Sequence, residues 1–425
     1  MHLTTAGDWW TIAWIAILTF LLNPLHYVVT GLVIWDLTRN VKLERDWFGV
    51  RVTRIGKTLL VRYAKSCLVG LLASVALLAI GVEVSWQSML YVTLMALVLG
   101  LIRSRFAATP FAISASLILS ELTKVLPLPK TGAWHGVVQV IQSVQAGPWL
   151  AIGAVCSLAE LVMTMWNAHD AVLPTLVTSR RGRRIGALKL QLGFVVPVVT
   201  WMTPIHHHAV VIDWSVHPWL FANWPPISFG ALPLVFGIHA LLTSLDPARV
   251  LRQLSYLQLI VVLVFIAGFT AGHWLWPAYQ WYTAVVVIVL FEVFRFLWRR
   301  TDAGMEPMCA PDTRGLRVLY TIRNSLSAKL GVRPGEIVTH VNQIPVHTEY
   351  DLHFAMEQNP AYAKFQVIDT RGELRLVSSP VFEGERHQLG LLLVVPSDEP
   401  AMRLRRPFGL LETLYLRRAK RHDSE

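Results

Sequence analysis

The sequence predicts a polytopic α-helical membrane domain followed by a small α+β domain. Hydrophobic residues make up 54% of the 425 residues and charged residues only 15%, whereas soluble chains carry about 25% charged residues. Apolar runs of nearly 20 residues, the length of a helix that crosses a bilayer, recur as far as residue 298. After residue 300 the sequence changes to short strand patterns, glycine turns and mixed charge.

Nine apolar segments are the expected membrane spans, which predicts about eight or nine helices. Several of the 17 tryptophans flank these segments, as interfacial rings do. The expected spans are 10–35, 67–82, 86–102, 106–122, 148–166, 190–202, 227–242, 254–275 and 282–298. With all nine crossing, every cluster of Lys and Arg falls on one side, which the positive-inside rule assigns to the cytoplasm. The segment 190–202 is short and contains Pro197, and without it the later clusters would turn outward.

The remaining composition argues against several function classes. The net charge is +11. We attribute this excess of Lys and Arg to cytoplasmic loops next to anionic lipid and not to nucleic-acid binding. Three scattered cysteines predict neither a metal site nor a disulfide framework. No His-Glu pair exists, which excludes the H-E-x-x-H zinc motif, and the spans leave no room for a trypsin-like double barrel. We therefore predict no catalytic residue, no metal, no cofactor and no enzyme activity.

Two polar features keep alternatives open. His206, His207 and His208 are consecutive, so on a helix they would point in different directions, and a structural role is preferred to a metal site. Glu160 and Glu292 lie in apolar runs. Burying a charged carboxylate in the bilayer costs free energy, so such residues are candidates for a functional role. A transporter or an intramembrane hydrolase thus remains as an alternative.

The sequence divides into four parts. Residues 1–300 form the membrane domain, 301–313 a linker, 314–396 the small α+β domain and 397–425 a basic tail. In the tail, the apolar residues Phe408, Leu410, Leu411, Leu414 and Leu416 precede the basic residues Arg417, Arg418, Lys420 and Arg421. Such a pattern suits an amphipathic helix on the inner membrane surface, and a solvated disordered tail is the alternative.

The stretch "GLRVLYTIRNSLSAKLGVRPGEIVTHVNQIPVHTEYDLHFAM" (315–356) resembles a PDZ domain of the bacterial type. The resemblance implies a groove in which a partner's extended chain end adds beside an edge strand and its carboxylate meets clustered backbone N–H groups. The loop is expected at Arg314, Gly315, Leu316 and Arg317, and the edge strand at Val318, Leu319 and Tyr320. Leu352, Ala355 and Met356 are expected to line the pocket on the facing helix. Leu352 and Met356 lie four residues apart on one helix face, so a role in the domain core is equally open.

The whole chain resembles the MinJ family of division proteins. The resemblance lies in "FLLNPLHY" (20–27), "RGRRIGALKLQLGFVVPV" (181–198), the PDZ-like stretch and "FEGERHQLGLLL" (382–393). It implies a scaffold in the cell membrane, enriched at septum and poles, with its PDZ domain in the cytoplasm. The implied partners are a DivIVA-like coiled-coil protein and MinD with its FtsZ inhibitor. Other division membrane proteins, the lipid bilayer and further copies of the chain are additional expected partners. A regulator of an envelope protease is the alternative.

Overall fold

The structure is a computed structural model of the chain. It describes residues 14, 17–18, 20–22, 24–49, 55–102, 104–126, 133–179, 183–203, 218–220, 228–359, 361–382, 389–394 and 402–403.

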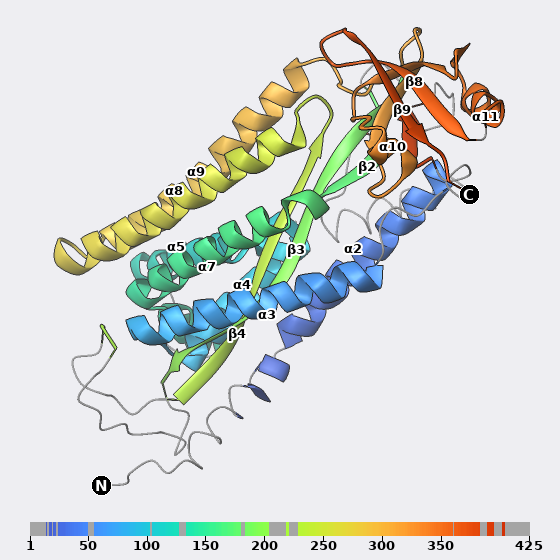
Figure 1. Cartoon of the computed structure of the whole chain (residues 1–425). Coiled ribbons are helices and arrows are strands. Elements are labelled where there is room, and N and C mark those ends of the chain that lie inside the picture. Colours follow the sequence, from blue (N-terminus) through green and yellow to red (C-terminus); the bar gives the residue numbers. More distant parts are fainter. Residues whose placement is uncertain are drawn as a thin grey trace, which may run out of the picture.

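The membrane domain is an elongated bundle of helices around a buried β-ribbon (Figure 1). Four of the described helices, α3, α7, α8 and α9, are long and apolar enough to cross a membrane, so the chain is a multi-pass membrane protein. The helices of this domain are α2 (Pro24–Phe48), α3 (Ile55–Ile80), α4 (Trp86–Ile102), α5 (Thr109–Val125), α6 (Ala133–Gln142), α7 (Ala146–Trp166), α8 (Pro247–Trp274) and α9 (Tyr279–Gly304). Helices thus occur in seven of the nine expected spans.

The prediction of helices at 190–202 and 227–242 is wrong. These segments lie in β3 (Arg184–Met202) and β4 (Ser228–Leu242), which pair antiparallel from Leu188↔Leu242 to Met202↔Ser228. β2 (Val172–Thr178) pairs with the first part of β3. Both misassigned segments contain a proline, which breaks a helix interior, and β-branched residues, which favour strands. With 19 residues, β3 extends about 60 Å, twice the thickness of a bilayer core.

The two prolines face each other across the ribbon at Pro197↔Pro233. The N–H groups of Val199 and Val235 donate to hydroxyls of helices at 2.8 Å, so they point away from the partner strand. Backbone direction repeats every second residue, and the ring nitrogens of Pro197 and Pro233 therefore also point outward. Proline thus removes N–H groups from positions where the ribbon has no strand to receive them.

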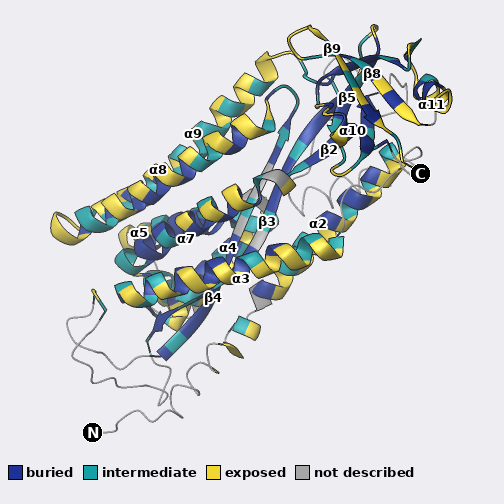
Figure 2. Cartoon of the chain, in the orientation of Figure 1, coloured by how far each residue is buried: buried dark blue, intermediate teal, exposed yellow. Residues whose placement is uncertain are grey.

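Helices cover the two edges of the ribbon. On the β3 side, Ser74 of α3 accepts from Val199, and a Cβ at Gly70 would collide with the carbonyl oxygen of Pro197. On the β4 side, the Thr109 hydroxyl accepts from the N–H of Val235 at 2.8 Å and donates to its carbonyl at 3.0 Å. Figure 2 shows the ribbon buried and the outer helix faces exposed. Exposed apolar helix faces of this kind suit contact with lipid.

The C-terminal domain is a sheet with two helices and its own hydrophobic core. Its strands follow the order β10-β5-β6-β8-β9, and β7 pairs with β6. The elements are β5 (Leu316–Thr321), α10 (Leu326–Lys329), β6 (Ile337–Val341), β7 (Ile344–Pro345), α11 (Glu349–Glu357), β8 (Tyr362–Ile368), β9 (Leu374–Pro380) and β10 (Leu391–Val394). The short strand patterns and glycine turns that follow residue 300 in the sequence therefore form one sheet with two helices.

The C-terminal domain rests on the β2–β3 hairpin. The N–H of Gly186 in β3 donates to the carbonyl of Cys309 at 2.8 Å, and a Cβ at Gly186 would press on Leu319 and Val394. Arg323 and Asp170 form an ion pair of 2.9 Å across the same junction. The two domains therefore meet through a close backbone contact.

Two short strands complete the fold. β1 (Glu83–Val84) pairs parallel with the far end of β3. β11 (Met402–Arg403), in the expected basic tail, pairs parallel with β2 at Val177 and Thr178. Arg417, Arg418, Lys420 and Arg421 lie outside the described residues.

Candidate functional site

The strand expected at the sheet edge is internal. β5 lies between β10 and β6, with pairs Leu392↔Tyr320 and Leu393↔Val318 on one side and Leu316↔Val338 on the other. Val318, Leu319 and Tyr320 therefore cannot form the edge to which a partner strand adds, and that expectation is wrong. The reason is that β10, formed 70 residues later in the chain, closes this side of the sheet.

Close packing within the sheet requires a residue without a Cβ at position 315. A Cβ at Gly315 would collide with the carbonyl oxygen of Val338 in β6. The glycine allows the chain to enter β5 against this neighbouring backbone. A bulky residue at Gly315 would thus test the fold of the domain rather than ligand binding.

Arg314 and Arg317 both contact Asp312. Nη2 of Arg314 lies 3.0 Å and Nη2 of Arg317 lies 2.7 Å from Oδ2 of Asp312. Arg317 also donates to the carbonyl of Gly335 at 3.1 Å. The hydrogen bond from Arg314, ahead of the other contributions, holds the pKa of Asp312 far below its usual range. The two guanidinium groups therefore hold Asp312 and fix the segment that leads into β5.

The three expected pocket residues of α11 face the domain core. Leu352, Ala355 and Met356 are each at most 3% exposed and belong to the cluster that contains Phe365. The helix begins with a capping box, in which Thr348 and Asp351 exchange side-chain and backbone hydrogen bonds as the sequence predicts. Thus α11 is fixed in position, with these three side chains beneath it.

The open edges of this sheet are β10 and β9, since no other strand among the described residues pairs with either outer edge. β10 follows Gly390, which has a φ of 72° and approaches Ser325 so closely that a Cβ would collide. Leu393 of β10 belongs to the same buried cluster as Leu352 and Met356. The signal for this edge in the sequence is Gly390 followed by four apolar residues, a pattern that predicts a strand but not its place at the edge of the sheet.

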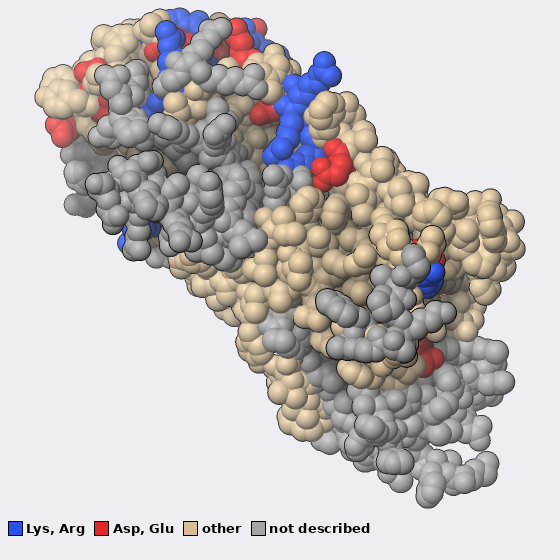
Figure 3. All heavy atoms as spheres, turned by 180° about the vertical axis from the view of Figure 1, so that it is seen from behind, with Lys and Arg blue, Asp and Glu red and all other residues tan. Residues whose placement is uncertain are grey.

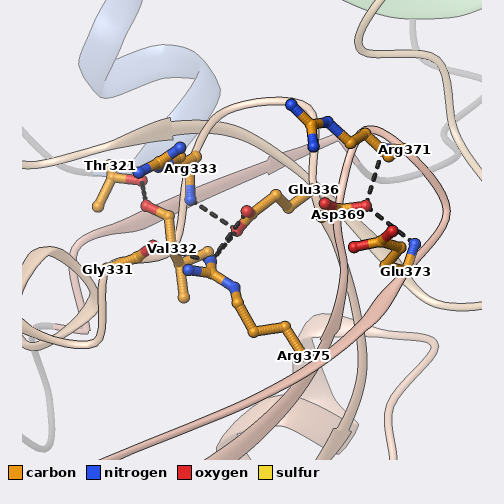
Figure 4. A network of polar contacts seen from close by, with 9 residues as sticks. All are labelled: Thr321, Gly331, Val332, Arg333, Glu336, Asp369, Arg371, Glu373 and Arg375. Atoms are coloured by element: carbon orange, nitrogen blue, oxygen red, sulfur yellow. Dashed lines mark hydrogen bonds and ion pairs between the residues drawn. The ribbon is translucent and has the colours of Figure 1, made fainter.

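A polar network joins β6 to β9 near the opposite edge (Figure 4). Nη2 of Arg375 lies 2.9 Å from the carboxylate of Glu336, which also accepts the backbone N–H of Arg333 at 2.8 Å. Asp369 closes the β8–β9 turn by accepting the N–H groups of Arg371 and Glu373. Backbone N–H groups, with that of Glu373 first, lower the pKa of Asp369.

Of the other candidate residues, the structure describes Glu160 and Glu292. Glu160 is buried in α7, and Gln258 of α8 contacts it and Thr164. Glu292 is half-buried in α9. His206, His207 and His208 lie outside the described residues. Within the described ranges there is no group of three or more His, Cys, Asp or Glu side chains that could hold a metal ion.

Charge is distributed unevenly over the molecule. Seen from behind, the Lys, Arg, Asp and Glu side chains gather at the end formed by the C-terminal domain (Figure 3). The helical surface below carries few charges among the described residues. This division matches a lipid-embedded part with a water-exposed end.

Comparison with known proteins identifies the relatives of the chain. No protein-family model and no solved structure matches it. It is 25% identical over 391 residues to the "Cell division topological determinant MinJ" of Bacillus subtilis (strain 168), covering 89% of this chain and 94% of the relative. It is 26% identical over 298 residues to the "Probable cell division topological determinant MinJ" of Lacticaseibacillus paracasei, covering 66% and 78%. The chain is therefore homologous, over nearly its whole length, to the cell division topological determinant MinJ.

Proposed function

We propose that the chain is a membrane adaptor for division-site selection. It links a DivIVA-like coiled-coil protein, which marks poles and septa, to MinD and its FtsZ inhibitor. The homology to MinJ over 89% of the chain carries this proposal. The role needs an anchor and binding surfaces, and it requires no catalytic group and no cofactor.

Within this role the C-terminal domain, at 314–396, is a PDZ domain. The support is the strand and helix order described above, together with the PDZ-like stretch from Gly315 to Met356. In such a domain a partner's extended segment binds by adding a strand to an exposed sheet edge.

The binding edge of this PDZ domain is β10. β5 pairs with its inner side, and no strand of the described part of the chain pairs with its outer side. The N–H of Ile322 donates to the carbonyl of Gly390, so by alternation the N–H of Leu391 points to the outer side. Leu352, Ala355 and Met356 share a buried cluster with Leu393, so α11 packs on the same core as β10. Of the residues expected at the loop and edge strand, Arg317, Val318 and Tyr320 pair with β10 from its inner side.

The C-terminal domain faces the cytoplasm. Basic residues occur at three helix ends that lie near this domain in Figure 1, namely the end of α2, the start of α8 and the end of α9. These residues are Arg45, Arg249, Arg252, Arg299 and Arg300. Basic residues next to spans favour the cytoplasmic side. The basic tail then lies where the inner leaflet is available to it.

The deciding experiment images a fluorescent fusion of the full chain in growing cells, with and without the DivIVA-like protein. We expect enrichment at septa and poles that is lost when that protein is deleted. A uniform membrane signal that the deletion does not change contradicts the adaptor role. That result would favour the regulator of an envelope protease or the transporter.

The groove is tested by Leu391→Pro, which removes an outward N–H but leaves the β10–β5 ladder intact. We expect loss of co-purification with one partner from a domain that still folds, although its unfolding temperature falls because Leu391 packs against the buried cluster. Leu374→Pro, at the other open edge, is the matched control and should retain that partner. Equal loss in both variants would refute the assignment of β10.

A further inference from the structure

The second open edge of the C-terminal sheet, β9, is long and regular. It pairs with β8 over seven residues from Tyr362↔Pro380 to Ile368↔Leu374 without a register shift. By contrast, the β10–β5 and β6–β8 pairs each contain an irregularity. Natural edges are usually blunted by bulges, charges or a covering element, because an unprotected edge accepts another strand. Among the described residues, the features of this kind along β9 are Pro380 at its end and the charge of Arg375, which is paired with Glu336.

The hydrogen bonds around β9 show which groups are available. The N–H of Val381 donates to the carbonyl of Ala361, and the N–H of Asp369 donates to that of Glu373. Because bonded pairs alternate along an antiparallel ladder, Arg375, Val377 and Ser379 bond to β8. The remaining residues, Leu374, Leu376 and Ser378, point their N–H and C=O groups to the open side.

The same residues present an apolar outer face. Leu374 is 64% exposed, Leu376 58% and Tyr362 of the adjacent strand 43%. The Tyr362 hydroxyl donates to Ser378 Oγ at 3.2 Å, which holds the ring along the strand. An apolar stripe beside an unpaired backbone favours strand addition over exposure to water.

The charge on β9 does not oppose such pairing. Arg375 is the one charged residue of the strand. Its guanidinium group forms the ion pair with Glu336 inside the domain, as Figure 4 shows. A second strand at the open edge therefore meets leucine, serine and tyrosine side chains.

We infer that two copies of the chain pair through β9, antiparallel about a two-fold axis at Leu376. This register sets Leu376 beside its own copy and Leu374 beside Ser378 of the other copy. Leu374, Leu376 and Ser378, which have outward N–H groups, all form hydrogen bonds to the second copy in this register. Pro380 has no N–H group and lies beyond the paired residues. Arg375 lies opposite Val377, so no like charges meet. A two-fold contact of this kind is self-complementary and closes at a dimer.

A second copy is the occupant that the strand fits best. The strand pairs with itself without a charge clash, as shown above. Both copies are held in one membrane at the same height, which raises the effective concentration of one edge for the other. The inference is independent of the proposed partners, since it concerns only this chain.

The pairing is tested by crosslinking Leu376→Cys in membranes with a short bismaleimide. The background carries Cys67→Ser, because Cys67 is exposed while Cys156 and Cys309 are buried. We expect a crosslinked dimer. Tyr350→Cys on α11, 77% exposed, is the matched control and should give none. A yield from Leu376→Cys no higher than the control overturns the proposal, as does crosslinking to a different protein.

A second variant separates pairing from folding. Leu376→Lys places two ammonium groups opposite each other in the dimer but lies on the surface of the monomer. Light scattering of the purified full chain should show loss of the dimer with an unchanged unfolding temperature. A dimer that persists in Leu376→Lys contradicts the inference.

Discussion

The β3–β4 ribbon of the membrane domain and the sheet of the C-terminal domain solve the same problem in opposite ways. Each is an antiparallel sheet with two edges. In the ribbon, Ser74 and Thr109 meet backbone groups at the edges, and Pro197 and Pro233 remove N–H groups. In the C-terminal sheet, β9 and β10 keep their outer edges unpaired within the described chain.

The difference follows from the solvent. In hydrocarbon an unpaired N–H or C=O costs several kcal/mol, so a ribbon can persist there only behind helices. In water the same groups are satisfied by solvent and stay available for a partner. The molecule thus closes its sheet edges in the lipid-embedded part, where unpaired groups would be costly, and keeps open edges in the described part of its water-exposed end.

The largest effect is expected when helix α3 is forced off the ribbon. Gly70→Leu would drive a side chain into the carbonyl of Pro197 and separate Ser74 from Val199. Because the obstacle is backbone, we expect destabilisation of about 3 kcal/mol or more. Thermal unfolding of the purified chain in detergent measures it.

Gly56→Leu is the matched control in the same helix, since nothing lies within 4 Å of a Cβ there. It should change the unfolding temperature little. Equal destabilisation by Gly56→Leu and Gly70→Leu would show that helix propensity, and not contact with the ribbon, is responsible.

A smaller effect is expected at the β4 edge. Thr109→Val keeps the shape of the side chain but leaves the N–H and C=O of Val235 without their hydroxyl partner. A buried group left unsatisfied costs about 1–3 kcal/mol. Denaturant unfolding in detergent should show this loss, and Thr109→Ser, which keeps the hydroxyl, should restore most of the stability. Similar stability in all three proteins would show that the edge is satisfied in another way.

The same comparison explains what could be predicted from the sequence. Local signals were sufficient for the helix at Trp86–Ile102 and for the capping box at Thr348, because helix length and caps depend on neighbours in sequence. Apolar run length cannot separate a helix from a buried strand, so 190–202 and 227–242 were misassigned despite Pro197 and Pro233. Strand order depends on distant pairing, and therefore β5 was placed at the edge that β10 occupies.

A threonine in the water-exposed domain provides a matched contrast to Thr109. The Thr348 hydroxyl accepts the N–H of Asp351 at 3.1 Å at the start of α11. Thr348→Ala removes this cap and should cost about 0.5–2 kcal/mol, less than Thr109→Val, because water replaces the lost partner. Unfolding of the full chain, followed by exchange of the α11 amides, measures the loss. Thr348→Ser should behave as the parent, and a cost above that of Thr109→Val would contradict the role assigned to solvent.

The smallest effect is a pH dependence at the same cap. Asp351 accepts the N–H groups of His347 at 3.0 Å and Thr348 at 2.9 Å. These bonds, with that of His347 first, lower the pKa of Asp351 below its ordinary value of 3.8. The folded state thus binds this proton less tightly than the unfolded state. Asp351 therefore contributes its full stabilisation at pH values above its ordinary pKa of 3.8. This stabilisation is lost as the pH falls through the lowered pKa of the folded state. Asp351→Asn should therefore be less stable than the parent at neutral pH, and the difference in unfolding temperature should shrink in acid. A difference that stays constant with pH would show that Asp351 acts by its shape and not by its charge.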